Sequence, residues 1–280
     1  MSAAPSISII VSVRNAVATL EQCLESVLGQ TYGARELIVI DGGSTDGSQD
    51  ILQRCSSRIA YWVSEPDRGI YPAWNKGLAQ AKGDWICFLG ADDYLWEPRT
   101  LECIAPILAE AYPSTRVVYG QVALVNSESQ RVLLMGRPWD EIRSLFPQIM
   151  CLPHTALMHH RSLFEQHGQF DESFRICGDY EMLLRELIAG EALFAKDTVV
   201  AAMGHGGVSS NPTKSLEMVL ELRRAQRMHG LRRPRRAWVA AWLRAHIKVC
   251  LWRLLGPRVA SRVFDRLRSM QGKEAYWTQP

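Results

Sequence analysis

The chain has 280 residues, of which 47% are hydrophobic and 22% charged, with a formal net charge of +3. This length and composition indicate a sizeable core, in one large domain or in one domain with an appendage. The seven cysteines are scattered and form no C-x-x-C pair, which disfavours a disulfide framework or a zinc site and suits a reducing compartment. Because no apolar run approaches ~20 residues, a membrane-spanning helix is not expected.

The small net charge conceals a strong asymmetry along the chain. Residues 1–222 contain 17 Lys and Arg against 27 Asp and Glu, whereas residues 223–280 contain 15 against 2. An acidic body with a basic tail points to an anionic partner for the tail, either a membrane surface or a nucleic acid.

Strand and helix patterns alternate over the first hundred residues. Strands rich in β-branched or apolar residues are predicted at 6–13, 36–41, 61–63 and 85–89, and helices at 19–28, 48–55 and 73–81. Such alternation predicts βαβ units and an α/β fold with a mostly parallel twisted sheet flanked by helices. Ligands of such sheets lie beyond the carboxyl ends of the strands.

The pattern changes after residue 100. Strands are predicted at 117–119, 121–125 and 131–135, as in a mixed or antiparallel edge, and helices at 163–167 and 180–189. From about residue 215 to the end, the sequence reads as helical and basic.

Asp92 and Asp93 are the most informative pair of residues, because they directly follow the apolar strand at 85–89. Two adjacent carboxylates at the end of a buried strand raise each other's pKa unless a cation neutralises them. Mg²⁺ and Mn²⁺ commonly bind through one or two carboxylates together with the phosphates of a substrate. The pair therefore predicts a metal–diphosphate site at the end of this strand.

Four further charged residues are candidates, each with a plainer interpretation. Asp41 ends a strand. It is either only a structural strand end before the N-cap of the next helix, or an acceptor of hydrogen bonds from a base or ribose. Arg68 and Lys76 lie between two acidic motifs, and either contact phosphate oxygens or are solvated surface charges. Asp179 lies where a helix begins and is either its N-cap or a general base.

Two histidines flanked by turn residues, His154 and His205, are weaker candidates, since a lone histidine is more often structural. The loop at 206–209, Gly-Gly-Val-Ser, is interpreted as a weak anion nest for a diphosphate. The chain contains neither a G-x-G-x-x-G fingerprint nor a Walker-type G-K-[ST] motif, which disfavours dinucleotide redox and P-loop chemistry.

Taken in order, these segments resemble the family 2 glycosyltransferases, strongly over residues 5–100 and more loosely to the loop at 206–209. The resemblance rests on the opening strand with Arg14-Asn15, the Val39–Gly47 segment, Glu65–Tyr71, Asn75-Lys76-Gly77, Gly83-Asp84-Trp85, Ala91-Asp92-Asp93, Pro153-His154, Phe170–Phe174 and Asp179-Tyr180-Glu181. The ordered series is far more specific than any one of these motifs.

The resemblance implies a GT-A fold and transfer of a sugar from a nucleotide sugar with inversion at the anomeric carbon. It implies that Asp41 contacts the nucleoside, that Asp92 and Asp93 hold ribose and metal, and that Asp179 is the base. Two positions depart from the family pattern: Gly90 stands where an Asp is frequent, and Gly178 where a Glu is frequent.

The chain is accordingly divided into two regions. Residues 1–212 form the predicted GT-A domain, with a Rossmann-like nucleotide-sugar-binding half at 1–100 and a mixed-sheet acceptor and catalytic half at 101–212. Residues 213–280 form a basic helical extension. In it Trp238, Trp242, Ala245, Val249 and Trp252 recur at helical spacing, interleaved with arginines. This extension is interpreted as an anionic membrane contact, a homo-oligomer interface or a helix packed on the catalytic domain; nucleic acid is not expected.

The sequence therefore predicts a glycosyltransferase that uses Mn²⁺ or Mg²⁺ to move a sugar from a nucleotide-diphosphate sugar to a saccharide acceptor, lipid-linked if the extension is a membrane anchor, in polysaccharide biosynthesis. The expected location is the cytoplasm, on the inner face of the cell membrane if the extension binds it, because no signal-peptide pattern opens the chain. The alternatives are a non-catalytic nucleotide-sugar-binding or membrane-scaffolding protein and a nucleotidyltransferase of similar fold.

Overall fold

The computed structural model describes residues 4–126, 130–204 and 212–270. Its strands are β1 (Ile7–Val13), β2 (Arg35–Asp41), β3 (Tyr61–Ser64), β4 (Trp85–Gly90), β5 (Asp93–Leu95), β6 (Val117–Val125), β7 (Arg131–Met135), β8 (Leu157–His160) and β9 (Leu193–Gly204). Its helices are α1 (Leu20–Leu28), α2 (Ser48–Cys55), α3 (Ile70–Gln80), α4 (Thr100–Ala111), α5 (Trp139–Ile142), α6 (Arg161–His167), α7 (Gly178–Leu187), α8 (Ser215–Met228) and α9 (Arg236–Ser269).

All nine of these strands belong to one sheet, in the order β3-β2-β1-β4-β8-β6-β9-β5, with β7 paired to β6. The pairs among β3, β2, β1 and β4 are parallel. From β8 onward the pairing is mixed, with β8 antiparallel to both neighbours and β9 parallel to β6. Strands β1 to β4 therefore form the predicted parallel part of the sheet. Strands β6 to β9, together with β5, which is antiparallel to β9, form the mixed part.

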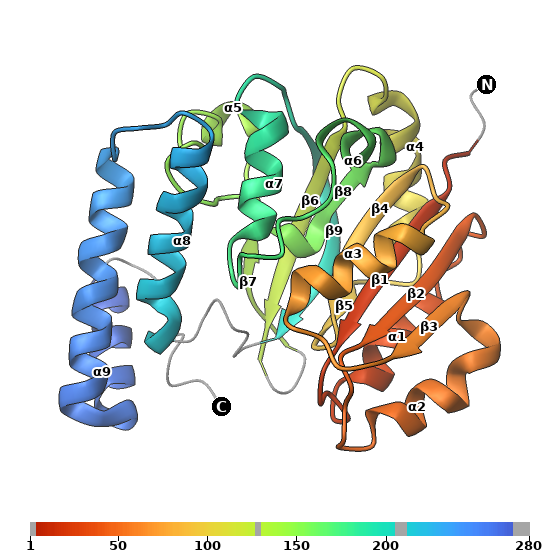
Figure 1. Ribbon diagram of the computed structural model, residues 1–280, viewed down its shortest axis with the longest axis horizontal. Coiled ribbons are helices and arrows are strands. Elements are labelled where there is room, and N and C mark those ends of the chain that lie inside the picture. The colour runs from red at the N-terminus through yellow and green to blue at the C-terminus, as the bar shows by residue number, and fades with distance from the viewer. Residues whose placement is uncertain (1–3, 127–129, 205–211, 271–280) are drawn as a thin grey trace.

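Helices cover both faces of the parallel half, because the strands are apolar on both sides. On one face, alternate residues of β1 such as Ile9 and Val11 pack with α1, α2 and α4. On the other face, Ile10 packs with α3 and with side chains from α6 and α7. The parallel strands consequently end at a single edge, where the loops that follow them gather (Figure 1).

The C-terminal helices stand side by side at the end of the molecule opposite β3 (Figure 1). Leu222 and Ala225 of α8 belong to the same buried cluster as the side chains of α3 and α7. Helix α9 turns back on itself at Gly256, whose φ of 73° a residue with a side chain rarely adopts. Within the described residues, no helix has the length and apolarity needed to cross a membrane.

Candidate functional site

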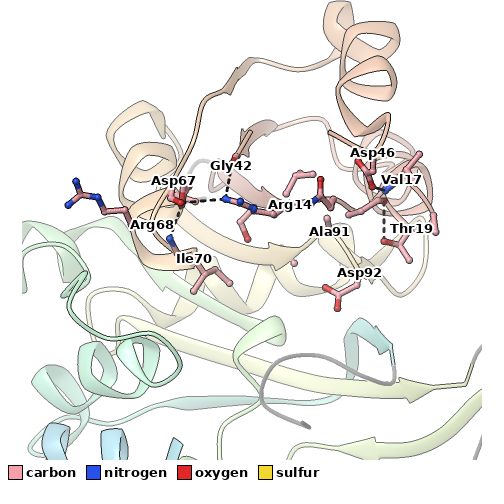
Figure 2. A pocket seen from close by; sticks show the side chains of 18 residues that line it. Arg14, Val17, Thr19, Gly42, Asp46, Asp67, Arg68, Ile70, Ala91 and Asp92 are labelled. Carbon is pink, nitrogen blue, oxygen red and sulfur yellow. Dashed lines mark hydrogen bonds between the residues drawn. The ribbon is translucent and has the colours of Figure 1, made fainter. Parts of the chain in front are cut away.

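A cavity of about 730 Å³ lies at the carboxyl ends of the parallel strands (Figure 2). It is bounded by the end of β1 and the segment after it, the loops after β2 and β3, the first turn of α3 and the end of β4. Its lining residues are Ser12, Val13, Arg14, Asn15, Ala16, Val17, Ala18, Thr19, Gly42, Asp46, Asp67, Arg68, Gly69, Ile70, Ala73, Gly90, Ala91 and Asp92. The edge of the sheet predicted to bind a ligand is therefore hollow.

Arg14, directly after β1, ties two of these loops together. Its guanidinium donates to the carbonyl oxygens of Gly42 (3.1 Å) and Asp67 (3.5 Å), as Figure 2 shows. Those carbonyls follow β2 and β3, so one side chain bridges three neighbouring strand ends. The resemblance included Arg14, but it was not among the predicted site residues.

Asp41, the last residue of β2, faces away from the cavity. Its side chain is fully buried. Its carboxylate accepts hydrogen bonds from the Ser44 backbone N–H (3.0 Å), from the Ser64 hydroxyl (2.5 Å) and from the Ser44 hydroxyl. Asp41 is not among the residues that line the cavity, and these bonds fold the loop that brings Gly42 to the cavity wall. The nucleoside contact of Asp41 stays a prediction.

Asp67 presents an acceptor that the sequence did not single out. One carboxylate oxygen accepts from the Gly69 backbone N–H (2.9 Å). The other, Oδ2, is buried and has no hydrogen-bond partner among the described residues. A Cβ at Gly42 would lie 3.6 Å from the Asp67 side chain, so the two residues are in contact at the wall. A buried, unpaired oxygen beside a cavity favours a ligand that supplies an N–H or O–H donor.

The two predicted cations of this region have different positions. Arg68 lines the cavity, although its side chain is exposed and its guanidinium points away from the other labelled residues in Figure 2. Lys76 does not line the cavity. Its ammonium instead forms an ion pair with the Glu65 carboxylate at 2.8 Å. The first turn of α3, through Gly69 and Ile70, does line it, and the N-terminal end of a helix attracts anions.

Asp92 and Asp93 point to different sides of the chain. Asp92 is exposed and lines the cavity. Asp93 is buried and accepts a 3.3 Å hydrogen bond from the Gly90 backbone N–H. Burial, and then the charge of Asp92, raise the pKa of Asp93 to about 8. In the described part of the chain, no three His, Cys, Asp or Glu side chains are grouped closely enough to hold a metal.

Asp179 lies in the first turn of α7, beside the first turn of α3. The Tyr71 hydroxyl donates to its Oδ1 (3.3 Å), and the Tyr180 backbone N–H donates to the same oxygen (2.8 Å). Burial raises the pKa of Asp179 to about 6, although both hydrogen bonds oppose that rise. Asp179 is outside the cavity lining, but Tyr71 directly follows Ile70, which belongs to it.

Neighbouring side chains occupy the space at both positions that depart from the family pattern. A Cβ at Gly178 would lie 2.8 Å from two ring atoms of Tyr71, closer than real contacts allow. A Cβ at Gly90 would lie 2.6 Å from Asp92 Oδ1 and 3.1 Å from Asp93 Oδ2. The ring of Tyr71 and the paired carboxylates therefore fill the places that the frequent acidic side chains would need.

Two positioning contacts were missed because they join distant parts of the sequence. Asn75 of α3 donates to the Phe170 carbonyl and accepts from the Phe170 backbone N–H, both at 3.0 Å. Glu221 of α8 accepts from three successive backbone N–H groups, those of residues 175, 176 and 177, at 2.8–2.9 Å. These three residues lead directly into α7, so Glu221 holds the segment that carries Asp179.

His154 is not among the residues that line the cavity. The His154 ring stacks on Trp74 with centroids 4.8 Å apart, and burial lowers its pKa to about 3. A neutral, stacked ring of this kind fits the structural interpretation. His205 and the loop at 206–209 lie outside the described residues.

The chain is similar to proteins of known class. The family description "Glycosyl transferase family 2" matches residues 8–168. A "PGL/p-HBAD biosynthesis glycosyltransferase" from Mycobacterium bovis BCG is 34% identical over 235 residues, which is 82% of this chain and 88% of that protein.

Solved structures share the fold at low sequence identity. S. aureus TarS 1–349 in complex with UDP-GlcNAc is 17% identical with a TM-score of 0.63, covering 86% of this chain and 72% of that one. Against the longer TarS chain, the match spans 43% of its length. The mannosyltransferase PcManGT from Pyrobaculum calidifontis, in complex with GDP-Man and Mn²⁺, is 16% identical with a TM-score of 0.61, covering 99% of this chain and 83% of that one.

Proposed function

Since the chain belongs to glycosyl transferase family 2, and is a glycosyltransferase with a GT-A type fold as predicted, we propose that it moves a sugar from a nucleotide-diphosphate sugar to a saccharide acceptor. We propose further that the transfer inverts the anomeric carbon, depends on a divalent metal and serves polysaccharide biosynthesis. The observation that carries the proposal is the cavity at the carboxyl ends of β1 to β4, with Asp92 on its wall.

The donor fits the lining of this cavity. Its volume is that of a pocket for a small ligand. The unpaired Asp67 Oδ2 supplies an acceptor for a base N–H or a ribose hydroxyl. The first turn of α3 supplies positive potential for the diphosphate. Arg68 lines the edge of the cavity and is the proposed second contact to the phosphates. The complexes of TarS with UDP-GlcNAc and of PcManGT with GDP-Man support a donor of this class.

The residues present fit a divalent metal of the kind predicted. Asp92 offers an exposed carboxylate at the cavity, and Asp93 supplies a second, buried carboxylate directly beside it in the chain. One or two carboxylates with substrate phosphates are a normal ligand set for Mg²⁺ or Mn²⁺. Asp92 would hold the ion, with Asp93 behind it, and the ion when bound stabilises the charge that develops on the leaving diphosphate.

Asp179 fits the role of general base. Its carboxylate takes the proton from the acceptor hydroxyl while that oxygen bonds to the anomeric carbon. The sugar–phosphate bond breaks in the same step, and its electron pair leaves with the nucleoside diphosphate. A pKa of about 6 keeps Asp179 mostly ionised near neutral pH and more basic than an ordinary aspartate. Because Tyr71 joins Asp179 to the first turn of α3, the base is fixed beside the donor cavity.

The acceptor is proposed to be a lipid-linked saccharide at the inner face of the cell membrane. The basic C-terminal region supports this assignment.

Thermal-shift measurements with UDP, GDP, ADP and CDP, with and without Mn²⁺, test the donor site. One nucleotide should raise the melting temperature of the wild type in a metal-dependent way. Asp92→Asn should lose most of this shift, whereas Asp50→Asn, an exposed position on α2 outside the cavity, should keep it. A wild type that responds to none of the four nucleotides would overturn the donor assignment.

Asp179→Asn tests the chemistry separately from binding. The variant should keep the nucleotide-dependent shift and lose turnover by about 10²–10⁴-fold, which is the usual contribution of a positioned base. The measurement is the release of nucleoside diphosphate from the donor. Release of pyrophosphate instead would indicate a nucleotidyltransferase, and a wild type that binds donor without turnover would indicate a binding or scaffolding protein.

A further inference from the structure

Helix α9 packs on the rest of the protein with the side that carries Trp238 and Ala245. The Trp238 indole N–H donates to the Val219 carbonyl of α8 (3.0 Å), and Ala245 is buried. Beyond the turn at Gly256, Ala260 and Phe264 are buried as well. The break at Gly256 divides α9 into a first arm, residues 236–255, and a second arm, residues 257–269. Lys248 of the first arm lies close enough to Arg268 of the second that, after burial and Arg244, this charge also lowers its pKa. The second arm therefore runs back along the first.

The opposite face of the first arm is apolar and exposed. Val239, Leu243, Ile247 and Leu254 have exposed fractions of 39%, 51%, 55% and 81%. Their spacings of four, four and seven residues place them on one side of a helix with 3.6 residues per turn. These four residues are named the outer stripe. At 100° per residue they lie roughly opposite Trp238 and Ala245, the side chains through which α9 meets α8 and the core. Helix α9 itself stands at the edge of the molecule in Figure 1.

Positive charge borders the outer stripe on both sides. At 100° per residue, Arg244 lies about 100° to one side of Leu243 and Arg253 about 80° to the other, and both arginines are exposed. The sequence of α9 contains eight Arg and Lys residues and a single carboxylate, Asp265, which is buried. The exposed charge of α9 is therefore uniformly positive.

We propose that the outer stripe binds an anionic membrane surface, with α9 lying in the plane of the interface. In this orientation the apolar side chains enter the boundary between headgroups and acyl chains, and the bordering arginines meet anionic headgroups. A second copy of this chain fits less well, because pairing two outer stripes brings two rows of arginine together. A nucleic acid would satisfy the arginines but leave the apolar side chains in water. A membrane surface at this site would bring the protein to a lipid-linked acceptor, and only that link rests on the proposed function.

Flotation of the full chain with vesicles tests this surface directly. Vesicles of phosphatidylcholine with 30% phosphatidylglycerol should carry the protein upward at low salt, and pure phosphatidylcholine vesicles should carry much less. The double variant Leu243→Ser/Ile247→Ser should lower the partition coefficient at least about tenfold. Arg244→Gln and Arg253→Gln should each lower it about fivefold. The matched control is Ile188→Ser, which changes a 44% exposed apolar residue at the end of α7.

Three results would overturn the inference: a wild type that stays unbound to anionic vesicles at low salt, a double variant that binds as well as the control, or a wild-type dimer that the double variant turns into a monomer. The nucleotide-dependent thermal shift, measured on the same samples, separates this failure from that of the proposed function. If the protein binds nucleotide but no vesicles, only the proposed membrane surface is overturned. If it binds vesicles but no nucleotide, only the proposed donor site is overturned.

Discussion

At the scale of single residues, Tyr71 compensates for the absence of a side chain at position 178. Its ring fills the space beside Gly178, and its hydroxyl is the only side-chain donor that the described residues offer to Asp179. A hydrogen bond to the ionised form of a carboxyl group lowers its pKa. Tyr71 therefore opposes the rise in pKa that burial causes, and keeps Asp179 ionised over a wider pH range.

Tyr71→Phe tests this effect, since it keeps the ring and removes only the donor. Without the hydrogen bond the pKa of Asp179 should rise, and because the base works ionised, the acid limb of the turnover–pH profile should move upward from about pH 6. A shift of about 0.5–1 pH unit is expected for one long hydrogen bond, with turnover at pH 8 changed only a few-fold. Tyr61→Phe, at an exposed tyrosine of β3, is the control. An unmoved acid limb would show that Tyr71 only packs.

At the scale of elements, α3 connects the donor cavity to the segment that leads to Asp179. Its first turn lines the cavity, and Asn75, one turn further on, bonds to both backbone polar groups of Phe170 and to the Glu172 carboxylate. Phe170 is itself buried. The helix thus fixes, from one rigid body, both the wall of the cavity and the chain that approaches α7.

Asn75→Ala should lower the free energy of unfolding by about 2–4 kcal/mol, because it leaves the buried N–H and C=O of Phe170 without partners. Urea unfolding followed by circular dichroism measures the change. Gln80→Ala, at an exposed position of the same helix, should stay within about 0.5 kcal/mol of the wild type. Equal stability of the two variants would contradict the role given to Asn75.

Sequence patterns predicted the elements better than the direction of individual side chains. The β-branched runs of β1 and β2 gave the parallel sheet, and the rule for strand ends placed Asp92 at a cavity. The direction of the Asp41 side chain was not predicted: side chains alternate along a strand, and Asp41 shares the buried face of Leu37 and Val39. Asn75 and Glu221 act on partners 95 and 44–46 residues away, which no local pattern encodes.

The C-terminal region showed the same limit. The tryptophan spacing predicted a helix, which α9 confirms, but the choice of the face that meets α8 depends on packing. That face carries Trp238 and Ala245, so the residues that remain exposed are those of the outer stripe.

At the scale of the whole molecule, α8 joins the C-terminal region to the catalytic body. Leu222 and Ala225 belong to the core cluster that contains Tyr71 and Tyr180, and Trp238 of α9 packs against it. The acidic body and the basic tail therefore differ in charge but share one core. Elements that share a core are expected to unfold together.

Leu222→Ala should lower the midpoint of a single unfolding transition, at a cost of about 2–4 kcal/mol, as for other buried leucines. Circular dichroism and tryptophan fluorescence should report the same midpoint in the wild type and in the variant. Leu220→Ala, at a half-exposed position of α8, should change it little. Two separate transitions, of which the variant moves only one, would show that α8 unfolds apart from the body.

The contact between Glu221 and the segment before α7 has a consequence for the exchange of parts between related enzymes. Three backbone N–H groups of residues 175–177 have their partner in a carboxylate on another helix. A hybrid that joins this chain's α7 to a foreign α8 would separate these donors from their acceptor, even if every residue near Asp179 were kept. The smallest unit that can be transplanted with the proposed base held in place is therefore the pair α7 and α8. Crossovers that keep this pair together should yield active hybrids more often than crossovers between the two helices.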